Sequence, residues 1–489
     1  MTKRLSTRHP VVVGLATGLY PFLYNYYSNF TLVDSLTQLF FFIGFFLLVP
    51  VAVNICLKIS SKKIPFVAKN YRLLLTISNA VGFASLLTFS ILGPKKKIIL
   101  LVIVLVFGLA FLLKKHLKKM VLLQYLLALI VAFQLGFYVA NNLNFSTEWK
   151  QLPDTIMEAN FKKKPNVYII QPDGYANAST LKEAPYAMDN SAFEDFLTEH
   201  NFKIYPNFRS NYSNTVTSNS SMFAMTHHYY KNPKPSSKEA YGLRKSIAGN
   251  NAAVSVFNKN GYKTSLLIES PYIIVNRPVL GYDYSSISYK DLSFLSRGFD
   301  INVDVVAEMK KAITENKNES NFYFVEKILP GHIPVQKSDS DGKEKERENY
   351  IENLEKANVW LRQMVTLITK NDPQALIVIV ADHGGYVGFN YTGELKQKVK
   401  DSTLVNSIFA ATLAIRWPNN EVPEFDTKLK TNVNLFRILF SYLSENETYL
   451  DQLENDESFL VVREDAPFGV YKVIDANGTF TFKRVPVKN

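Results

Sequence analysis

Before residue 150 the chain is mostly apolar, and this constrains its fold more than any other feature of the sequence. A helix needs about 20 apolar residues to cross the hydrocarbon core of a membrane. Five segments approach that length: residues 11–28, 33–57, 71–92, 98–113 and 120–140. The fourth is short, but the lysines at both its ends can extend to the membrane surface. The sequence therefore predicts a transmembrane domain of five helices over residues 1–141.

The positive charge of the chain is concentrated in this apolar part. The formal net charge is +12, and residues 1–149 contain 15 Lys and Arg against only Asp34 and Glu148. Residues 150–489 contain 40 basic and 41 acidic residues and are therefore balanced. An excess confined to the loops between apolar segments is typical of membrane proteins and gives no reason to expect a nucleic-acid partner. The single cysteine, Cys56, excludes an internal disulfide.

The distribution of Lys and Arg between the loops predicts the orientation of the helices. The amino terminus and the loops near residues 58–72 and 114–119 are rich in Lys and Arg, which favours a cytoplasmic location. Lys95–Lys97 in the third loop are an exception. With five spans and a cytoplasmic start, everything after residue 141 is predicted to lie outside the cytoplasm.

The rest of the chain has the pattern of an α/β domain. After a linker at residues 142–164, strand-like and helix-like stretches alternate, which favours a mostly parallel sheet between helices over residues 165–450. The predicted helices cover residues 190–199, 251–260, 303–316, 345–369 and 433–444, and strands are predicted at 264–269, 321–328 and 408–415. Residues 451–489 alternate around Asn477-Gly478, which predicts a small antiparallel appendage.

Two predicted buried strands end in side chains that suit a metal ion. Residues 376–385 read LIVIVADHGG, a continuous apolar run that ends in Asp382 and His383. Residues 165–175 form a similar run that ends in Asp173 beside Gly174. Ligands of open α/β sheets bind at this edge, and oxygen and nitrogen donors suit a divalent cation such as Zn²⁺ or Mn²⁺. A polar strand end that merely caps a turn is the alternative.

Two further segments carry candidate catalytic side chains. Residues 209–225 are crowded with hydroxyl groups, and Thr215 is placed to begin a helix, where an anionic group would be favoured. A hydroxyl that touches a metal ion there would become a nucleophile, although an ordinary Ser/Thr helix cap has the same pattern. In residues 322–335, His332 follows a strand and is suited to contact a phosphoryl oxygen or to protonate a leaving group. A lone loop histidine is more often simply exposed.

Together and in this order, the four segments resemble the sulfatase-like branch of the alkaline phosphatase superfamily. The motifs are Asp-Gly-Tyr, Asn-Tyr-x-x-Thr-x-x-Ser, Gly-His-x-Pro and Ala-Asp-His-Gly, and they cover residues 165 to about 420. With the preceding membrane segments, the chain most resembles lipoteichoic acid synthases and lipid A phosphoethanolamine transferases.

This resemblance implies a set of roles. Asp173, Thr215, Asp382 and His383 would bind one divalent metal ion (Mn²⁺, Zn²⁺ or Mg²⁺). Thr215 would also be the nucleophile, with Thr217 as the alternative, and His332 would bind substrate.

Two departures from the family pattern narrow the chemistry. A true sulfatase carries a Cys or Ser followed by Pro and Arg at the nucleophile, and this chain has neither there. Gly174 also stands where sulfatases have a second aspartate. Two-zinc phosphatases need a further histidine late in the chain, but no histidine follows His383. A sulfatase proper is therefore not expected, and one metal ion is expected.

The leading hypothesis from the sequence is a membrane-bound transferase. It would move a phosphoglycerol- or phosphoethanolamine-type group from a phospholipid to an envelope glycan or lipid through a phospho-threonine intermediate. The expected location is a bacterial-type plasma (inner) membrane, with the catalytic domain outside the cytoplasm. A phosphodiester or sulfuric ester hydrolase of the same superfamily and a catalytically inactive partner in envelope assembly are the alternatives.

The predicted orientation can be tested with reporter fusions. A reporter enzyme that is active only outside the cytoplasm should be active when fused after Asn489 and inactive when fused after Ser61, in a predicted cytoplasmic loop. Activity of the Ser61 fusion alone would mean that one span has been miscounted.

Overall fold

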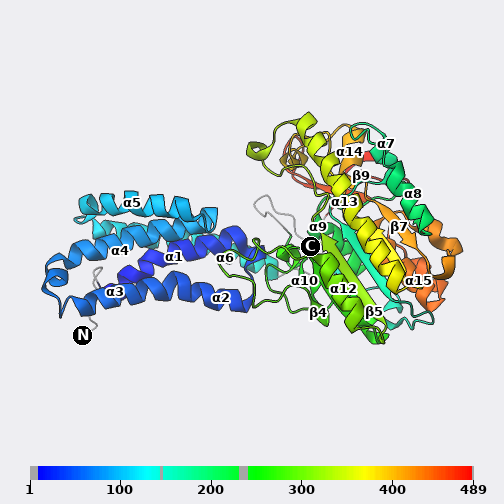
Figure 1. The fold of residues 1–489 in the computed structure, drawn as a ribbon. Coiled ribbons are helices and arrows are strands. Elements are labelled where there is room, and N and C mark those ends of the chain that lie inside the picture. The colour runs from blue at the N-terminus through cyan, green and yellow to red at the C-terminus, as the bar shows by residue number, and fades with distance from the viewer. Residues whose placement is uncertain (1–8, 144–146, 231–239, 487–489) are drawn as a thin grey trace. The chain divides into compact units, whose positions relative to one another are not determined.

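The computed structural model describes residues 9–143, 147–230 and 240–486. Contacts divide them into two compact units. The helical unit is built from residues up to 144 together with Val275–Arg277 and Leu292–Asp300, and the α/β unit contains the remaining residues. Figure 1 shows the helices of the first unit in blue and cyan.

The helical unit follows the apolar segments of the sequence. Its helices are α1 (Pro10–Asn29), α2 (Leu36–Ile43), α3 (Val49–Ser60), α4 (Pro65–Leu92), α5 (Lys96–Leu113) and α6 (Leu117–Leu143). A π-helical turn, Gly44–Leu48, joins α2 to α3 without a break. Among the described residues, four helices are long and apolar enough to cross a membrane: Leu36–Ser60, Pro65–Leu92, Lys96–Leu113 and Leu117–Asn142. Helix α1 is not among these four, so a span at residues 11–28 stays a prediction.

Helix α1 packs closely within the helical unit because small residues line one side of it. A Cβ atom on Gly14 would lie 2.5 Å from the Val51 Cα, and one on Gly18 would lie 1.6 Å from the Phe46 carbonyl oxygen. Small residues four positions apart allow helix backbones to approach in this way. Substituting either glycine would therefore push α1 away from α3 and the turn before it.

A buried amide pair connects α4 and α6 and also reaches α1. Asn79 Nδ2 donates to Gln124 Oε1 at 2.9 Å, and Gln124 Nε2 donates back to Asn79 Oδ1 at 3.1 Å. Asn79 Nδ2 also lies 2.9 Å from Thr17 Oγ1. Polar groups surrounded by apolar helices need such partners, so this network fixes the rotation of three helices about their axes.

The central sheet of the α/β unit is mostly parallel, as predicted. Its strands have the order β2-β7-β6-β1-β5-β3-β4. They cover Lys203–Ile204 (β2), Leu413–Arg416 (β7), Leu376–Val380 (β6), Val167–Pro172 (β1), Asn321–Lys327 (β5), Lys263–Ile268 (β3) and Tyr284–Ser285 (β4). Strand β7 runs antiparallel to both β6 and β2. Every residue of β1 and β6 is buried, which explains their unbroken apolar runs.

Alternate side chains of β5 face two different helical layers. Phe322 stacks on Phe257 of α11 (Ala252–Lys259), and Phe324 packs edge-on against Phe223 of α9 (Thr215–Ala224). Between them, Tyr323 points the other way and donates to the Ala312 carbonyl of α12 (Val305–Glu315). The period of two along a strand thus places α9 and α11 on one face of the sheet and α12 on the other.

The remaining helices include three that were predicted, at residues 190–199, 345–369 and 433–444, and three that were not. They are α7 (Ala178–Lys182), α8 (Ser191–Glu199), α10 (Lys245–Ala248), α13 (Lys343–Asn371), α14 (Ser402–Phe409) and α15 (Leu435–Ser444). The predicted strand at 408–415 is wrong in its first half, because α14 continues to Phe409. Asp401 caps that helix by accepting from Thr403 N, and its buried Val405, Ile408 and Phe409 have helical spacing.

The antiparallel appendage is a three-stranded sheet in the order β10-β9-β8. Its strands are β8 (Ser458–Val462), β9 (Gly469–Ile474) and β10 (Phe480–Val485). Gly478 adopts a φ of 83° in the turn between β9 and β10, which is why the Asn-Gly pair marks this hairpin.

A buried ion pair attaches the predicted linker to the α/β unit. Arg437 on α15 is 1% exposed, and its guanidinium lies 2.5 Å from Asp154 Oδ2 and also donates to the Tyr449 carbonyl at 3.1 Å. Asp154→Ala leaves this buried cation without its carboxylate, which should lower the free energy of unfolding of the α/β unit by about 3 kcal/mol. Thermal unfolding checks this, with Asp451→Ala at an exposed position as the control. Equal unfolding temperatures for both variants would contradict the expected role.

Candidate metal centre and nucleophile

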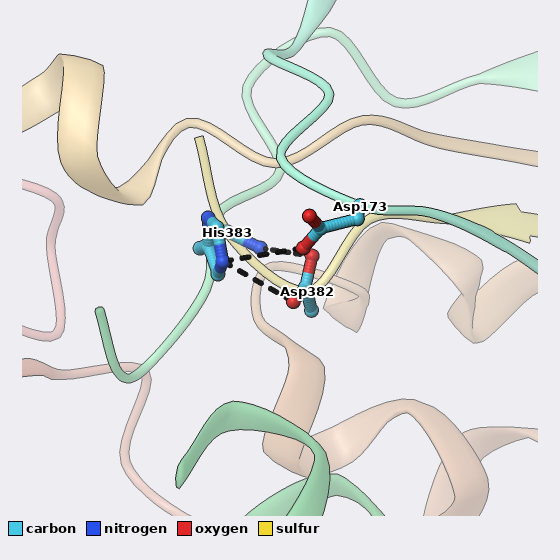
Figure 2. A group of neighbouring side chains, drawn as sticks. All are labelled: Asp173, Asp382 and His383. Atoms are coloured by element: carbon cyan, nitrogen blue, oxygen red, sulfur yellow. Dashed lines mark hydrogen bonds and ion pairs between the residues drawn. The ribbon is translucent and has the colours of Figure 1, made fainter. Parts of the chain in front are cut away.

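Three candidate ligands meet at one edge of the central sheet. Asp173 follows β1, and Asp382 and His383 follow β6, the strand that pairs with β1 in parallel. Parallel neighbours end on the same side of a sheet, so these side chains come together although they are far apart in sequence. One ligand atom from each lies within 4.8 Å of the others, and all three residues are buried. Figure 2 shows the two carboxylates pointing toward the imidazole.

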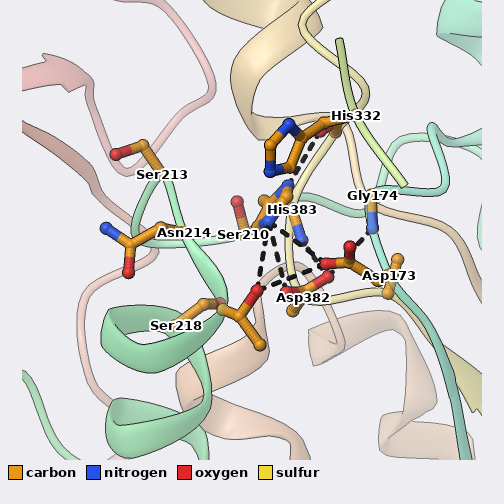
Figure 3. Close-up of polar contacts among 12 residues, drawn as sticks. Asp173, Gly174, Ser210, Ser213, Asn214, Ser218, His332, Asp382 and His383 are labelled. Carbon is orange, nitrogen blue, oxygen red and sulfur yellow. Dashed lines mark hydrogen bonds and ion pairs between the residues drawn. The ribbon is translucent and has the colours of Figure 1, made fainter. Parts of the chain in front are cut away.

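The fourth candidate, Thr215, is the first residue of α9. Asn214 caps this helix by accepting from Thr217 N at 3.1 Å. The cap directs the Thr215 hydroxyl to the carboxylates: its Oγ1 lies 3.2 Å from Asp173 Oδ1 and 3.5 Å from His383 Nε2. The start of α9, with Asn214 and Ser218, lies beside His383 in Figure 3. The structure thus brings all four predicted residues together.

The hydrogen bonds around these residues leave more acceptors than protons. His383 Nδ1 lies 2.8 Å from the Gly384 carbonyl, which can only accept, so Nδ1 carries a proton and a neutral His383 offers the lone pair of Nε2. That lone pair faces Asp382 Oδ2 at 3.3 Å and Asp173 Oδ1 at 3.5 Å. The Thr215 hydroxyl donates to this group, at 3.2 Å from Asp173 Oδ1.

The two oxygens of the Asp382 carboxylate differ in their hydrogen bonds. Asp382 Oδ1 accepts from the backbone N–H groups of Gly174 at 3.1 Å and His383 at 3.0 Å. Asp382 Oδ2 is fully buried and has no hydrogen-bond partner in the described part of the chain. A buried acceptor of this kind is costly unless a cation or proton satisfies it. The residues therefore fit a divalent cation held by two carboxylates, one imidazole and one hydroxyl.

Negative charge accumulates in this buried region. Burial, reinforced by the charge of Asp173 and opposed by His383, raises the pKa of Asp382 to about 6. Glu326 on β5 is 1% exposed, and burial followed by the charges of Asp173 and Asp382 raises its pKa well above the usual value. The sequence analysis did not single out Glu326. The signal available was a carboxylate inside an otherwise apolar strand.

His332 lies next to the cluster but outside it. Its ring centroid is 5.8 Å from that of His383, and its Nδ1 is 2.6 Å from the Ile333 carbonyl oxygen. The side chain is exposed, so it stands between the buried residues and solvent. Figure 3 shows His332 next to His383 on the side away from Asp382. Its predicted role with substrate stays a prediction.

The alternative nucleophile, Thr217, is engaged elsewhere. Its Oγ1 lies 3.1 Å from the Asn214 carbonyl oxygen within the first turn of α9. Side chains two positions apart on a helix point in different directions, and the described contacts connect Thr217 to none of the three candidate ligands. The geometry favours Thr215.

Close packing explains the glycines beside the ligands and identifies two tyrosines that the sequence did not reveal. A Cβ on Gly174 would lie 2.5 Å from the Gly331 carbonyl oxygen, and one on Gly385 would lie 2.1 Å from the ring of Tyr350. The Tyr350 hydroxyl donates to the Gly174 carbonyl at 2.9 Å and accepts from Ala176 N at 3.1 Å. The Tyr386 ring stacks on that of His383 at 5.1 Å. No local pattern marks either tyrosine.

Comparison with known proteins gives structural likeness only. No model of a known protein family matches the sequence, and neither does any curated protein. The chain is similar in structure to the C-terminal periplasmic domain of EcEptC from Escherichia coli, with 12% identity and a TM-score of 0.42 over 66% of this chain and 96% of that one.

Two further solved structures show the same degree of likeness. One is the lipoteichoic acid synthase LtaP from Listeria monocytogenes, with 15% identity and a TM-score of 0.43 over 67% of this chain and 90% of that one. The other is the soluble domain of lipooligosaccharide phosphoethanolamine transferase A from Neisseria meningitidis, with 11% identity and a TM-score of 0.39 over 59% of this chain and 92% of that one. Identities and TM-scores this low decide neither the activity nor the ligands of this chain.

The metal centre can be tested on the purified full chain. Asp382→Ala removes a ligand whose second oxygen is orphaned, so metal affinity should fall by more than the 10- to 100-fold typical of changes to outer-shell groups. Thr215→Ala leaves two carboxylates and the imidazole and should keep the metal bound. Metal content by mass spectrometry after dialysis against a chelator measures both. A normal metal content in Asp382→Ala would contradict the assigned site.

Proposed function

We propose that this chain is a membrane-bound, metal-dependent phosphotransferase that uses Thr215 as its nucleophile. One observation carries the proposal: Thr215 Oγ1 stands at the start of a buried helix, 3.2 Å from a carboxylate and 3.5 Å from an imidazole lone pair. An ordinary helix-capping hydroxyl would not be surrounded by three converging acceptors. Asp173, Asp382 and His383 would hold one divalent cation. When bound, that cation would lower the pKa of the Thr215 hydroxyl and offset the charge of the phosphoryl oxygens.

The first step joins the transferred group to the protein. Thr215 Oγ1 attacks the phosphorus of a phosphodiester, its proton passes to Asp173 Oδ1, and the bond from phosphorus to the lipid alcohol breaks. The leaving alcohol takes a proton from solvent, because desolvation and the charge of His383 lower the pKa of His332 to about 4 and leave that imidazole neutral near pH 7. The N-terminus of α9 favours the negative phosphoryl group through its free N–H groups and its dipole.

The second step returns the group to an acceptor. A hydroxyl of the acceptor attacks the phospho-threonine ester, transfers its proton to a carboxylate or to His332, and restores the Thr215 hydroxyl. These two steps could transfer either a phosphoglycerol- or a phosphoethanolamine-type group. The four apolar helices support a phospholipid as the donor, because helices of this length and composition would place the chain in the membrane that contains the phospholipid. The acceptor would be an envelope glycan or a lipid on the side of the membrane away from the cytoplasm.

The two threonines provide the test of the nucleophile. Thr215→Ala removes the attacking oxygen and should lower transfer from a labelled phospholipid by at least about three orders of magnitude. Thr217→Ala should have a mild effect, because that hydroxyl donates to the Asn214 carbonyl and no described contact connects it to Asp173, Asp382 or His383. Mass spectrometry of wild-type protein stopped during turnover should show the phosphorylated group on Thr215. A normal rate for Thr215→Ala with an inactive Thr217→Ala would reverse the assignment.

The same assay distinguishes transfer from hydrolysis. With acceptor present, a transferase should deliver the label to the acceptor, whereas a hydrolase would release it to water in equal amount with or without acceptor.

A further inference from the structure

A pocket of about 330 Å³ opens beside His332. One wall is the loop from Pro330 to Pro334, and the other is one face of α13. The helix contributes Glu346, Asn349, Tyr350 and Asn353, whose spacing of three, four and seven residues places them on the same face. At this volume the pocket is large enough for a small organic group.

A buried carboxylate without a cation lines this pocket. Glu346 is only 4% exposed. Its Oε1 accepts from Asp341 N at 2.8 Å, but neither oxygen forms an ion pair within the described residues. Charged side chains are almost never buried to this extent unless they are paired. Glu346 is therefore a buried carboxylate with no ion-pair partner among the described residues.

The other pocket groups are acceptors or neutral. The side-chain amide of Asn349 makes no hydrogen bond to the described part of the chain, so it is available to a ligand. Glu352 is already paired with Lys356 at 2.7 Å, and the same lysine donates to Asn353 Oδ1 at 3.2 Å. No Lys or Arg side chain lines the pocket. Apart from the N-terminus of α13, no positive group faces Glu346 among the described lining residues, so a cationic ligand group would pair with it.

We propose that this pocket binds the primary ammonium group of a substrate amino alcohol, with Glu346 as its counter-ion. This inference rests on the proposed function and selects the phosphoethanolamine-type group over the phosphoglycerol type. An ammonium has three N–H donors, which match the oxygens of Glu346 and of the neighbouring Asn side chains. Glycerol hydroxyls would leave the buried charge unpaired. A quaternary amine would require an aromatic cage, and the described lining residues offer only the Tyr350 ring and the imidazole of His332.

The pocket is connected to the candidate nucleophile site by two of its own residues. His332 lines the pocket and lies next to His383. Tyr350 lines it as well and donates to the carbonyl of Gly174, the neighbour of Asp173. In this proposal, the phosphoryl group lies near Thr215 and its amino alcohol extends past His332 toward Glu346.

A binding experiment on the full chain in detergent tests the inference without turnover. In the Thr215→Ala background, O-phosphoethanolamine should bind at least about tenfold more tightly than sn-glycerol 3-phosphate, as one charge-assisted hydrogen bond would provide. Glu346→Gln keeps the acceptor for Asp341 N but loses the charge, and should abolish this preference. Equal affinity for the two probes, or an unchanged preference in Glu346→Gln, would overturn the inference.

Two further variants keep the experiment decisive. Glu355→Gln makes the same change on an exposed residue of α13 outside the pocket, and it should retain the preference. Asn349→Asp adds a carboxylate to the same wall and should increase the preference, so the outcome does not depend on the folding of Glu346→Gln alone. Loss of the preference in Glu355→Gln, or no increase in Asn349→Asp, would count against a specific role for the pocket.

Parallel assays with wild-type protein separate this inference from the proposed function. If binding prefers the amine but Thr215 never becomes phosphorylated, the pocket assignment stands and the transferase proposal fails. If Thr215 accepts phosphoglycerol as readily as phosphoethanolamine, the transferase proposal stands and the pocket assignment fails.

Discussion

The site depends on three hydrogen-bond acceptors that face one another with too few protons between them. His383 presents a lone pair because its other nitrogen is fixed to the Gly384 carbonyl. Two buried carboxylates, Asp173 and Asp382, converge on that lone pair. Such an arrangement is unstable unless a cation is present. The same imbalance would favour a divalent cation at this position, and it is therefore the physical basis of the proposed function.

The scaffold that holds these acceptors is rigid for a separate reason. The backbone around Gly174 and Gly385 is packed so closely against Gly331 and Tyr350 that no side chain fits. Tyr350 also bonds to the backbone on both sides of Tyr175. Helix α13, which supplies Tyr350, therefore supports the backbone that follows Asp173 and forms one wall of the neighbouring pocket. The pocket proposed to bind ligand and the proposed metal site therefore share Tyr350.

The helical unit is stabilised by different interactions. Its helices expose large apolar side chains, so burial from water is not what draws them together in a membrane. Gly14 and Gly18 allow close backbone approach, and the Asn79–Gln124 pair supplies hydrogen bonds in the apolar interior. A lipid-facing unit of this kind fits an enzyme whose donor is itself a membrane lipid.

The sequence by itself determined the class of each unit and identified the four candidate site residues that the structure brings together. Apolar length, the uninterrupted strands and the Asn-Gly hairpin are local patterns, and the structure follows them closely. The error at residues 408–415 also has a local cause, since the end of an apolar helix and the start of a strand are composed of similar residues. Asp173, Thr215, Asp382 and His383 were recognisable because each follows or begins a regular element.

Only the tertiary structure decided which groups act together. The free lone pair of His383, the orphaned oxygen of Asp382 and the engagement of Thr217 depend on hydrogen bonds that the sequence does not display. Glu346 looks like one more charge in a charged helix until the loop from Pro330 to Pro334 encloses it. The physical reason is that burial and pairing depend on contacts between distant parts of the chain. The periodicity and composition of a sequence describe only residues that are close together along the chain.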